Sequence, residues 1–287
     1  MVYVVIFAYY EKSPLYKDNL EYFLQTAKTR ECDDTFIYIV VVNGTHTIDV
    51  SKYPECLFYE RPNTGFDFAG YFYGLRGIDS LSFWGGGIGS IDGYFFLNAS
   101  CRGPFLPTYY KGSWIRPFLD VAKKENAYMV SSTINILEKY TTLIPSCQTY
   151  AFYLHPTVAS YLVSSGFASK IYNDMQDVVM KQELGLSVLC LNNGWNISCL
   201  VPEYQRDYVA QGQGVLPNPF AKKTYGDICF PGGLCYGRDI HPYEVVFFKT
   251  NYMGFTNMVA SLSHAPTVTA VQTRNEDGTG LISRAGL

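Results

Sequence analysis

The sequence is poor in charge. Only 16% of its 287 residues are Asp, Glu, Lys or Arg, and 22 basic residues against 25 acidic ones leave a net charge of −3. A chain without a basic excess has little with which to neutralise the phosphates of DNA or RNA. We therefore expect no nucleic-acid partner.

Long apolar runs are missing as well. The longest cover residues 2–10 and 36–42, whereas a helix that spans a membrane needs about 20 residues. The first run starts with β-branched residues and follows no basic segment, which is unlike a secretory leader. The sequence thus predicts a chain without a transmembrane segment, located in the cytoplasm.

Several motifs that would point to a particular chemistry are absent. The eight cysteines contain no Cys-x-x-Cys pair, and the chain has no Walker loop, no Gly-x-Gly-x-x-Gly loop and no Gly-x-Ser-x-Gly elbow. The usual sequence evidence for a zinc site, a P-loop, a dinucleotide site or a serine hydrolase is therefore lacking. Because the cysteines lie in apolar stretches, we expect them to be reduced thiols packed in the core.

What the chain does have is apolar material, with 48% hydrophobic residues that include 25 Tyr and 19 Phe. Short β-forming runs alternate with segments of helical periodicity, which is typical of βαβ units and predicts an α/β fold with a mostly parallel central sheet flanked by helices. The expected strands are residues 2–7, 36–42, 56–59, 93–97, 128–132, 149–154, 195–201 and 245–249. The expected helices are residues 18–30, a segment that ends at residue 77, residues 156–165 and residues 174–192. Residues 80–90 and 203–243 are rich in glycine or irregular and are expected to form loops.

Four residues follow the third expected strand: Arg61, Asn63, Gly65 and Asp67. A loop after a parallel strand lies at the carboxyl edge of the sheet, where open α/β folds bind their ligands. Arg61 offers a planar fork for a phosphate or a base edge, and Gly65 allows the backbone to approach closely. Asp67 has two interpretations that stay open at this point: it accepts a ribose hydroxyl, or it caps the next helix.

A second polar group, formed by Asn98, Ser100 and Arg102, ends the strand expected at residues 93–97. Enzymes that use sugar nucleotides commonly carry Asp-x-Asp here, and its two carboxylates hold a divalent ion against the diphosphate. Asn98 and Ser100 offer only neutral, weak oxygen ligands, so a requirement for Mn²⁺ or Mg²⁺ is left undecided. Arg102 could neutralise phosphate charge instead.

Carboxylates and cations of the second half complete the candidates. Asp177 and Glu183 lie six residues apart in the helix expected at 174–192, which places them on different faces. One of them could act as a general base, although a solvated helix face is the commoner explanation for such residues. His241 and Lys249 could bring positive charge to a phosphate.

Two other classes of protein remain open. Cys101 follows a strand, as the nucleophile of a cysteine hydrolase could, but the sequence ties no histidine to it. The abundant tyrosines would also suit a carbohydrate-binding protein without catalytic activity, because their rings pack against sugars.

Six stretches of the sequence form a pattern when they are read in order: YYE at residues 9–11, NLEYFL at 19–24, RPNTGFDF at 61–68, FLNASCRGPF at 96–105, ELGLS at 183–187 and HPYEVVFFK at 241–249. This pattern resembles a group of glycosyltransferases found in algae, fungi and the large DNA viruses of chlorella-like algae, a group similar to rhamnan-synthesis-type transferases. The resemblance covers about residues 2–250, and the stretch from Asn98 to Phe105 is its most specific part.

This resemblance implies a GT-A-like (Rossmann-like) fold and transfer of a xylose- or rhamnose-class sugar, from a UDP-sugar as the expected donor, to an oligosaccharide or glycoprotein glycan. For a viral member, the product would be a capsid glycan made in the host cytoplasm. The sequence has no internal repeat and no low-complexity linker, which predicts one domain at residues 1–264, followed by a polar, poorly periodic tail at 265–287. With the resemblance, this becomes a catalytic domain with a nucleotide-binding half at 1–127 and an acceptor half at 128–264.

The resemblance also assigns roles to residues. Glu183 becomes the expected base of an inverting reaction, with Asp177 as the second catalytic candidate. Residues 61–67 would cradle the nucleotide and residues 98–102 would lie beside the diphosphate. The end of the first strand, formed by Phe7, Ala8 and Tyr9, would complete the nucleotide site.

Overall fold

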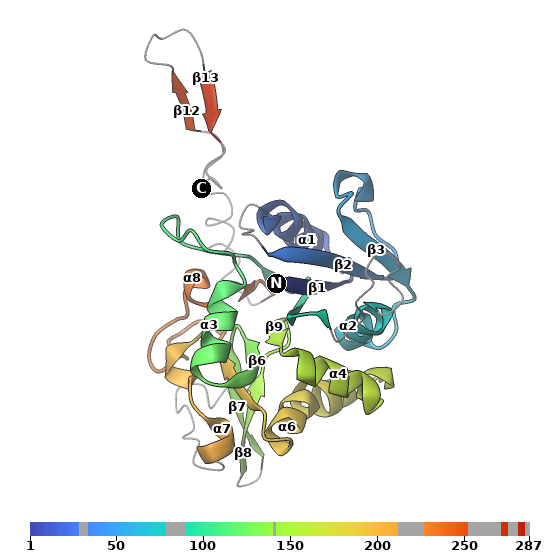
Figure 1. Ribbon diagram of the computed structural model, residues 1–287, viewed down its shortest axis with the longest axis vertical. Helices are drawn as coiled ribbons and strands as arrows, with labels where there is room; N and C mark the ends of the chain where they lie inside the picture. Colours follow the sequence, from blue (N-terminus) through green and yellow to red (C-terminus); the bar gives the residue numbers. More distant parts are fainter. Residues whose placement is uncertain are drawn as a thin grey trace.

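The centre of the protein is a seven-stranded sheet with the strand order β10-β6-β9-β4-β1-β2-β3 (Figure 1). The computed structural model describes residues 1–28, 34–78, 90–139, 142–211, 227–251, 271–274 and 281–284. Neighbouring strands run parallel except β9, which is antiparallel to both β4 and β6. The predicted α/β class with a mostly parallel sheet is therefore confirmed. The strands of this sheet are β1 Val2–Tyr9, β2 Thr35–Asn43, β3 Cys56–Arg61, β4 Gly93–Asn98, β6 Ala127–Ser131, β9 Ala151–Leu154 and β10 Asn196–Cys199.

Helices cover both faces of this sheet (Figure 1). Alternate side chains of β1 enter two separate cores, with Ile6 in one and Phe7 in the other. The first core packs against α2, α4 and α6, and the second packs against α1 and α3. Burial on both faces explains why the strands appear in the sequence as continuous apolar runs rather than alternating ones. The helices are α1 Pro14–Thr26, α2 Phe66–Gly77, α3 Arg116–Lys124, α4 Pro156–Ser164, α5 Met175–Val178 and α6 Leu184–Asn192, with a π-helical turn at Val179–Glu183 and short α7 Tyr208–Gln211 and α8 Pro242–Val245.

Smaller elements lie outside the central sheet. Single turns of 3₁₀ helix occur at Val50–Lys52, Phe167–Ser169 and Pro202–Tyr204. The remaining strands form three antiparallel pairs: β5 Cys101–Arg102 with β11 Phe248–Lys249, β7 Ile134–Lys139 with β8 Thr142–Cys147, and β12 Val271–Arg274 with β13 Leu281–Arg284.

Several sequence-based expectations need correction. The strand expected at 245–249 is wrong for most of its length, because α8 runs to Val245 and only Phe248 and Lys249 pair as a strand. The tail expected at 265–287 contains the hairpin of β12 and β13. The first helix starts at Pro14 rather than residue 18, since proline fits the first helical turn. The loop expected at 80–90 lies outside the described residues except for Ser90.

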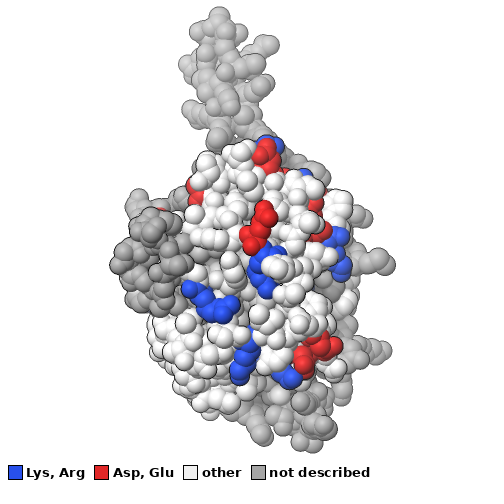
Figure 2. All heavy atoms as spheres, turned by 90° about the vertical axis from the view of Figure 1, so that its right-hand side faces the viewer, with Lys and Arg blue, Asp and Glu red and all other residues white. Residues whose placement is uncertain are grey.

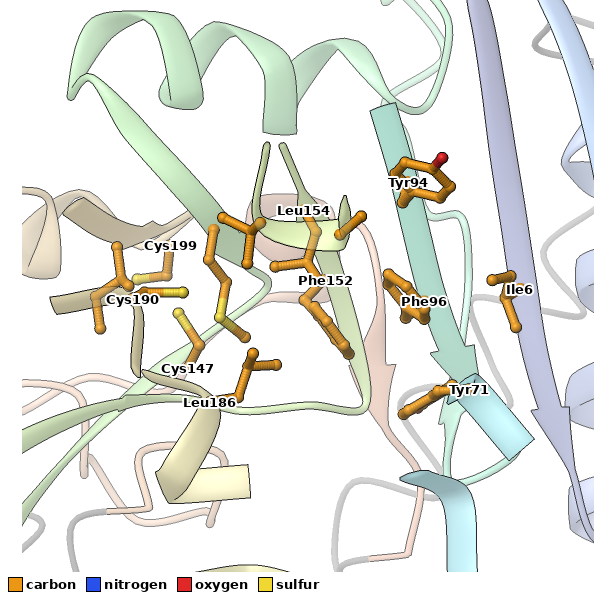
Figure 3. Close-up of a cluster of buried hydrophobic side chains, with 14 of the residues drawn as sticks. Ile6, Tyr71, Tyr94, Phe96, Cys147, Phe152, Leu154, Leu186, Cys190 and Cys199 are labelled. Carbon is orange, nitrogen blue, oxygen red and sulfur yellow. The ribbon is translucent and has the colours of Figure 1, made fainter. Parts of the chain in front are cut away.

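The thiols that the structure describes are packed as expected. All seven described cysteines are free, and six of them are buried. Cys147, Cys190 and Cys199 lie together beside Leu186 in the first core (Figure 3). Burial raises the pKa of Cys147 to about 12, so this thiol stays neutral and unreactive.

Figure 2 shows one face, on which the described acidic and basic side chains are scattered among uncharged ones without a continuous patch of one sign. Among the described helices, none combines the length and apolar character needed to cross a bilayer. The distribution of charge on the face shown therefore does not indicate a binding site.

Candidate functional site

The parallel strands end side by side at one edge of the sheet. The register pairs Ala8 of β1 with Asn98 of β4, and Asn43 of β2 with Arg61 of β3. The antiparallel strand β9 begins at the same edge, where the N–H of Asn98 donates to the carbonyl of Tyr150 at 3.0 Å. The polar segments that follow β3 and β4 therefore open on the same edge, as the sequence predicts.

The loop between β3 and α2 is held in an unusual backbone shape. Gly65 and Phe66 both have positive φ values, of 74° and 52°, and the second is strained because a residue with a Cβ rarely adopts that region. Arg61 fixes the loop from within, since its guanidinium donates to the side-chain oxygen of Asn43 and to the carbonyl of Thr64 at 2.9 Å. In the structure, the guanidinium of Arg61 therefore holds the loop in place against the end of β2.

This loop places the side chain of Asp67 next to Asn98, and Asp67 is not the N-cap of α2. Gly65 is the residue that caps α2, and no side chain bonds to the free N–H groups there. The capping interpretation of Asp67 is therefore wrong. Its carboxylate instead accepts a hydrogen bond of 2.8 Å from the side-chain nitrogen of Asn98.

Asn98 is held in one orientation by the residues around it. Its side-chain oxygen accepts from the N–H of Ser100 at 3.0 Å and from the hydroxyl of Ser100 at 2.6 Å. These two bonds occupy both lone pairs of the oxygen, while the nitrogen is turned toward Asp67. Asn98 is thus arranged to orient a carboxyl group.

The hydrogen bonds of the Asn98 side-chain oxygen also affect whether this stretch can bind Mn²⁺ or Mg²⁺, which the sequence leaves undecided. An oxygen whose lone pairs already accept two hydrogen bonds is a poor cation ligand, so the Asn98–Ser100 stretch does not fit the role of Asp-x-Asp. Within the described ranges, no three His, Cys, Asp or Glu side chains gather in a way that could hold a metal ion.

The helical segment expected at 174–192 is interrupted by the π-helical turn, which ends on Glu183. Asp177 lies before this turn on the outside, where its carboxylate pairs with Lys181 at 2.8 Å. Glu183 faces inward, where the N–H and hydroxyl of Thr149 lie beside its carboxylate. The two carboxylates are on different sides, and only Glu183 lies at the sheet edge. Single π turns within helices are frequent at functional sites.

The charge of Glu183 acts on the carboxyl group of Asp67. Burial, and next the charge of Glu183, raise the pKa of Asp67 to about 7, against a smaller opposing effect of the Asn98 hydrogen bond. Burial also raises the pKa of Glu183, while Lys249 and Thr149 act in the opposite direction. Two carboxyl groups whose ionisation is coupled, at the edge where such folds bind ligands, are a candidate active site.

Lys249 brings positive charge to this site. Its ammonium lies 3.5 Å from the carboxylate of Asp227 and 5.4 Å from the centre of the Tyr150 ring. The side chain of Gln148 holds Asp227 with a hydrogen bond of 3.0 Å. Sequence reasoning missed Asp227, which lies in a segment without a motif around it. It also missed Thr149, which was expected to begin a strand but lies in the turn before β9.

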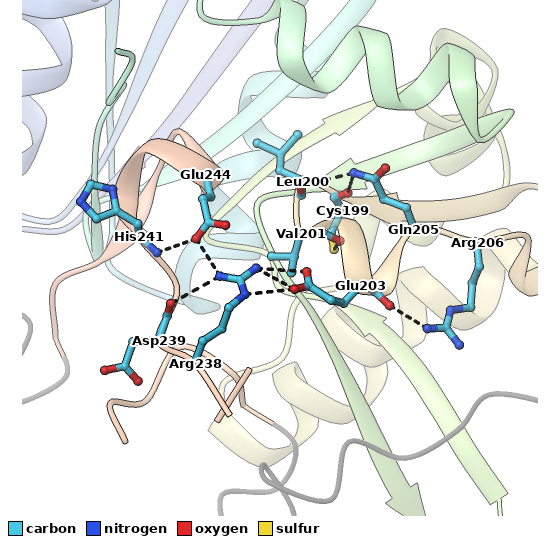
Figure 4. Close-up of polar contacts among 10 residues, drawn as sticks. All are labelled: Cys199, Leu200, Val201, Glu203, Gln205, Arg206, Arg238, Asp239, His241 and Glu244. Carbon is cyan, nitrogen blue, oxygen red and sulfur yellow. Dashed lines mark hydrogen bonds and ion pairs between the residues drawn. The ribbon is translucent and has the colours of Figure 1, made fainter. Parts of the chain in front are cut away.

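Arg238 connects the segment that carries Asp227 and Lys249 to Glu203, which lies earlier in the chain (Figure 4). The guanidinium of Arg238 pairs with Glu203 and with Glu244, each at 2.9 Å. His241 is the N-cap of α8. Its ring nitrogen accepts a hydrogen bond from the backbone N–H of Tyr243, and its backbone N–H donates to the carboxylate of Glu244 at 2.8 Å. His241 is thus seen in a capping box, and its proposed contact with phosphate stays a prediction.

The remaining predicted ligand-binding residues differ in exposure. Phe7, Ala8 and Tyr9 are buried in the cores of the sheet. Asn63 is exposed in the loop after β3. The guanidinium of Arg102 is buried and donates to Asn19 of α1 at 2.9 Å. Their contacts with a nucleotide stay predictions.

Cys101 is poorly suited to nucleophilic chemistry. Its side chain is only 2% exposed, and its thiol donates to the carbonyls of Asn98 and Tyr150 at 3.3 and 3.4 Å. Burial raises the pKa of this thiol far above its usual value, and a neutral thiol is a weak nucleophile. The surroundings of Cys101 therefore do not suit a cysteine hydrolase.

Comparison with known proteins gives no relative in sequence. No family model matches the chain, and no curated protein matches it. A proposed glucose-1-phosphate thymidylyltransferase from Bacillus anthracis, solved with a sucrose, resembles it in structure with a TM-score of 0.41 and 9% identity, over 69% of this chain and 86% of that chain. A CMP:2-keto-3-deoxy-manno-octonic acid synthetase complexed with CTP gives a TM-score of 0.38 and 10% identity, over 69% of this chain and 89% of that chain. Similarities of this size carry no information about activity.

Proposed function

We propose that the protein is a glycosyltransferase that moves a sugar from a nucleotide donor to a hydroxyl of a glycan acceptor, with inversion at the anomeric carbon. The observation that carries this proposal is the meeting of Asp67, Asn98 and Glu183 at the carboxyl edge of the parallel strands. Open α/β folds bind their ligands at this edge. The sequence resemblance supplies the reaction, because the stretches that contain these three residues are among those shared with the glycosyltransferases.

Glu183 is the base in this proposal. Its carboxylate takes the proton of the acceptor hydroxyl, and the acceptor oxygen then attacks the anomeric carbon from the face opposite the leaving diphosphate. Lys249 stabilises the negative charge that develops on the diphosphate. Asp177, in its outward ion pair with Lys181, takes no part.

The finer assignments stay open to test. A UDP-sugar of the xylose or rhamnose class is the first donor to try, and an oligosaccharide or glycoprotein glycan is the expected acceptor. A product in viral capsid or surface glycan synthesis follows from the resemblance alone.

The test is a panel of sugar nucleotides, assayed first for binding by thermal shift and then for nucleotide release and sugar transfer, with and without Mn²⁺. We expect at least one donor to stabilise the protein and to be turned over. Glu183→Gln should lower the rate about 100-fold or more, whereas Asp120→Asn should leave it unchanged, because Asp120 is exposed on α3. Wild-type transfer by purified Glu183→Gln would refute the assignment of the base.

The same panel separates the other class of protein. A chain that binds glycan but releases nucleotide from no donor is a carbohydrate-binding protein and not a transferase. Incubation of a sugar 1-phosphate with each nucleoside triphosphate adds a third outcome, since formation of pyrophosphate would make the protein a nucleotidyltransferase.

A further inference from the structure

The two carboxyl groups of the site have different surroundings. Among the described residues, Asp67 receives one hydrogen bond, from the side-chain nitrogen of Asn98 at 2.8 Å, and its other oxygen receives none. The charge that acts on it is that of Glu183, which has the same sign. Glu183, by contrast, has the N–H and hydroxyl of Thr149 beside it and the ammonium of Lys249 within electrostatic range.

This asymmetry decides which group keeps a proton. Two carboxylates that repel each other across a half-buried site do not both stay ionised, and the proton goes to the group whose ionised form has fewer hydrogen-bond donors. That group is Asp67, whose pKa burial and the charge of Glu183 raise to about 7. Glu183 is the group that stays ionised.

The other titratable groups around the pair do not disturb this division. Tyr16 of α1, Tyr71 of α2 and Cys101 of β5 all interact with Asp67, and burial raises the pKa of each, so all three are neutral near pH 7. Asp227 faces Glu183 but is paired with Lys249.

A neutral acid at position 67 suits a neighbouring phosphate. The carboxyl group of Asp67 is hydrogen-bonded to Asn98, one of the residues proposed to lie beside the negatively charged diphosphate of the donor. An ionised carboxylate would repel that diphosphate, whereas a carboxylic acid can donate a hydrogen bond to it.

We propose that Asp67 is a second catalytic residue, which in its neutral form donates a hydrogen bond to the phosphate oxygen that leaves the sugar, while ionised Glu183 takes the proton of the acceptor hydroxyl. This inference rests on the proposed function. The acceptor O–H bond breaks and its proton goes to Glu183, the acceptor oxygen bonds to the anomeric carbon, and the carbon–phosphate-oxygen bond breaks with its electron pair on the nucleoside diphosphate. The proton of Asp67 stays on its carboxyl group, so no further reactant is needed.

The first test is the pH dependence of transfer. The wild-type rate should fall as the pH rises through about 7, because Asp67 then loses its proton. Asp67→Asn keeps a neutral hydrogen-bond donor and should lose this alkaline decline, whereas Asp67→Ala should be about 100-fold slower. Asp120→Asn should show the wild-type profile. An alkaline decline near pH 7 that persists in Asp67→Asn would overturn the inference.

A second measurement needs no donor. Carbon-13 NMR of the carboxyl groups should show one group in the wild type with a midpoint near pH 7, absent from Asp67→Asn and moved to lower pH in Glu183→Gln. Turnover of sugar nucleotide together with an Asp67 that titrates in the ordinary range refutes this inference alone. A perturbed pair in a protein that turns over no sugar nucleotide refutes the proposed function and the role of Asp67 with it.

Discussion

Replacing Gly65 with alanine should destabilise the protein by more than its backbone conformation alone explains. The φ of 74° lies in the left-handed region, where a residue with a Cβ loses about 1–2 kcal/mol. A Cβ at this position would also lie 2.6 Å from the Cβ of Ala69 and 2.7 Å from Cγ2 of Ile171. Overpacking of this kind adds about 1–3 kcal/mol. We expect Gly65→Ala to lower the free energy of unfolding by about 2–5 kcal/mol in total.

Gly166 provides a matched control. Its φ of 73° is nearly the same as that of Gly65, but no atom lies within 4 Å of a Cβ built there. Gly166→Ala should therefore show only the conformational loss of about 1–2 kcal/mol. The difference between the two variants isolates the contact of the loop with α2 and with Ile171.

Urea denaturation of the two glycine variants measures this difference. Ile171 is 50% exposed, so Ile171→Ala should have little effect by itself and should recover part of the loss when combined with Gly65→Ala. Equal losses in Gly65→Ala and Gly166→Ala would show that the loop is not packed as described. Such a result would also remove the support for the position of Asp67, which lies two residues further on.

Two further predictions concern stability. The pKa of Asp67 is higher in the folded than in the unfolded chain, so the free energy of unfolding should fall by up to about 4 kcal/mol as pH rises from about 4 to about 7. Urea denaturation across this range should show the decline in the wild type but not in Asp67→Asn. Equal declines in the two proteins would contradict the raised pKa of Asp67. Arg238→Ala removes the part-exposed ion pairs with Glu203 and Glu244 and should lower the free energy of unfolding by about 1 kcal/mol, an effect that shrinks at high salt; a loss that does not depend on salt would argue against these ion pairs.

The central sheet could be predicted because its physical cause is visible in the sequence. Strands buried on both faces need apolar residues at every position, and runs such as the one that becomes β2 contain almost nothing else. Element boundaries were less accurate, by up to four residues at the start of α1. There the apolar periodicity begins one turn after the helix itself does.

Other elements lacked such a cause or carried competing signals. In α3, Phe118 is buried and Leu119 and Ala122 pack against the second core as partly buried side chains, but the helix has only nine residues. Its apolar spacing extends over little more than two turns, which is short for a prediction. Val245 and Val246 favour a strand by composition, yet His241, Pro242 and Glu244 form a helix start with a capping box. Local capping chemistry decided the structure there, and the propensity of the β-branched pair did not.

The pairing of Asp67 with Glu183 could not be predicted from spacing. It joins a loop that depends on two left-handed residues to a helix that contains a π turn, and neither irregularity has a reliable sequence signature. The six-residue spacing did predict that Asp177 and Glu183 point in different directions. It could not say which of them points inward, because that depends on how the whole segment docks against α2, β8 and β10.

Residue 98 is Asn where Asp-x-Asp would place an aspartate, and this difference is linked to the presence of Asp67, which Asn98 contacts directly. The side chain of residue 98 lies 2.8 Å from the carboxyl group of Asp67, and an aspartate there would bring a second carboxyl group into direct contact, so that like charges would repel whenever neither group holds a proton. Asparagine removes that repulsion and supplies the N–H that orients Asp67, while Ser100 prevents its side chain from turning over. On this argument the carboxyl group of the site is provided by α2 instead of by the end of β4, and Asn98→Asp should restore a cation-binding group only by displacing Asp67.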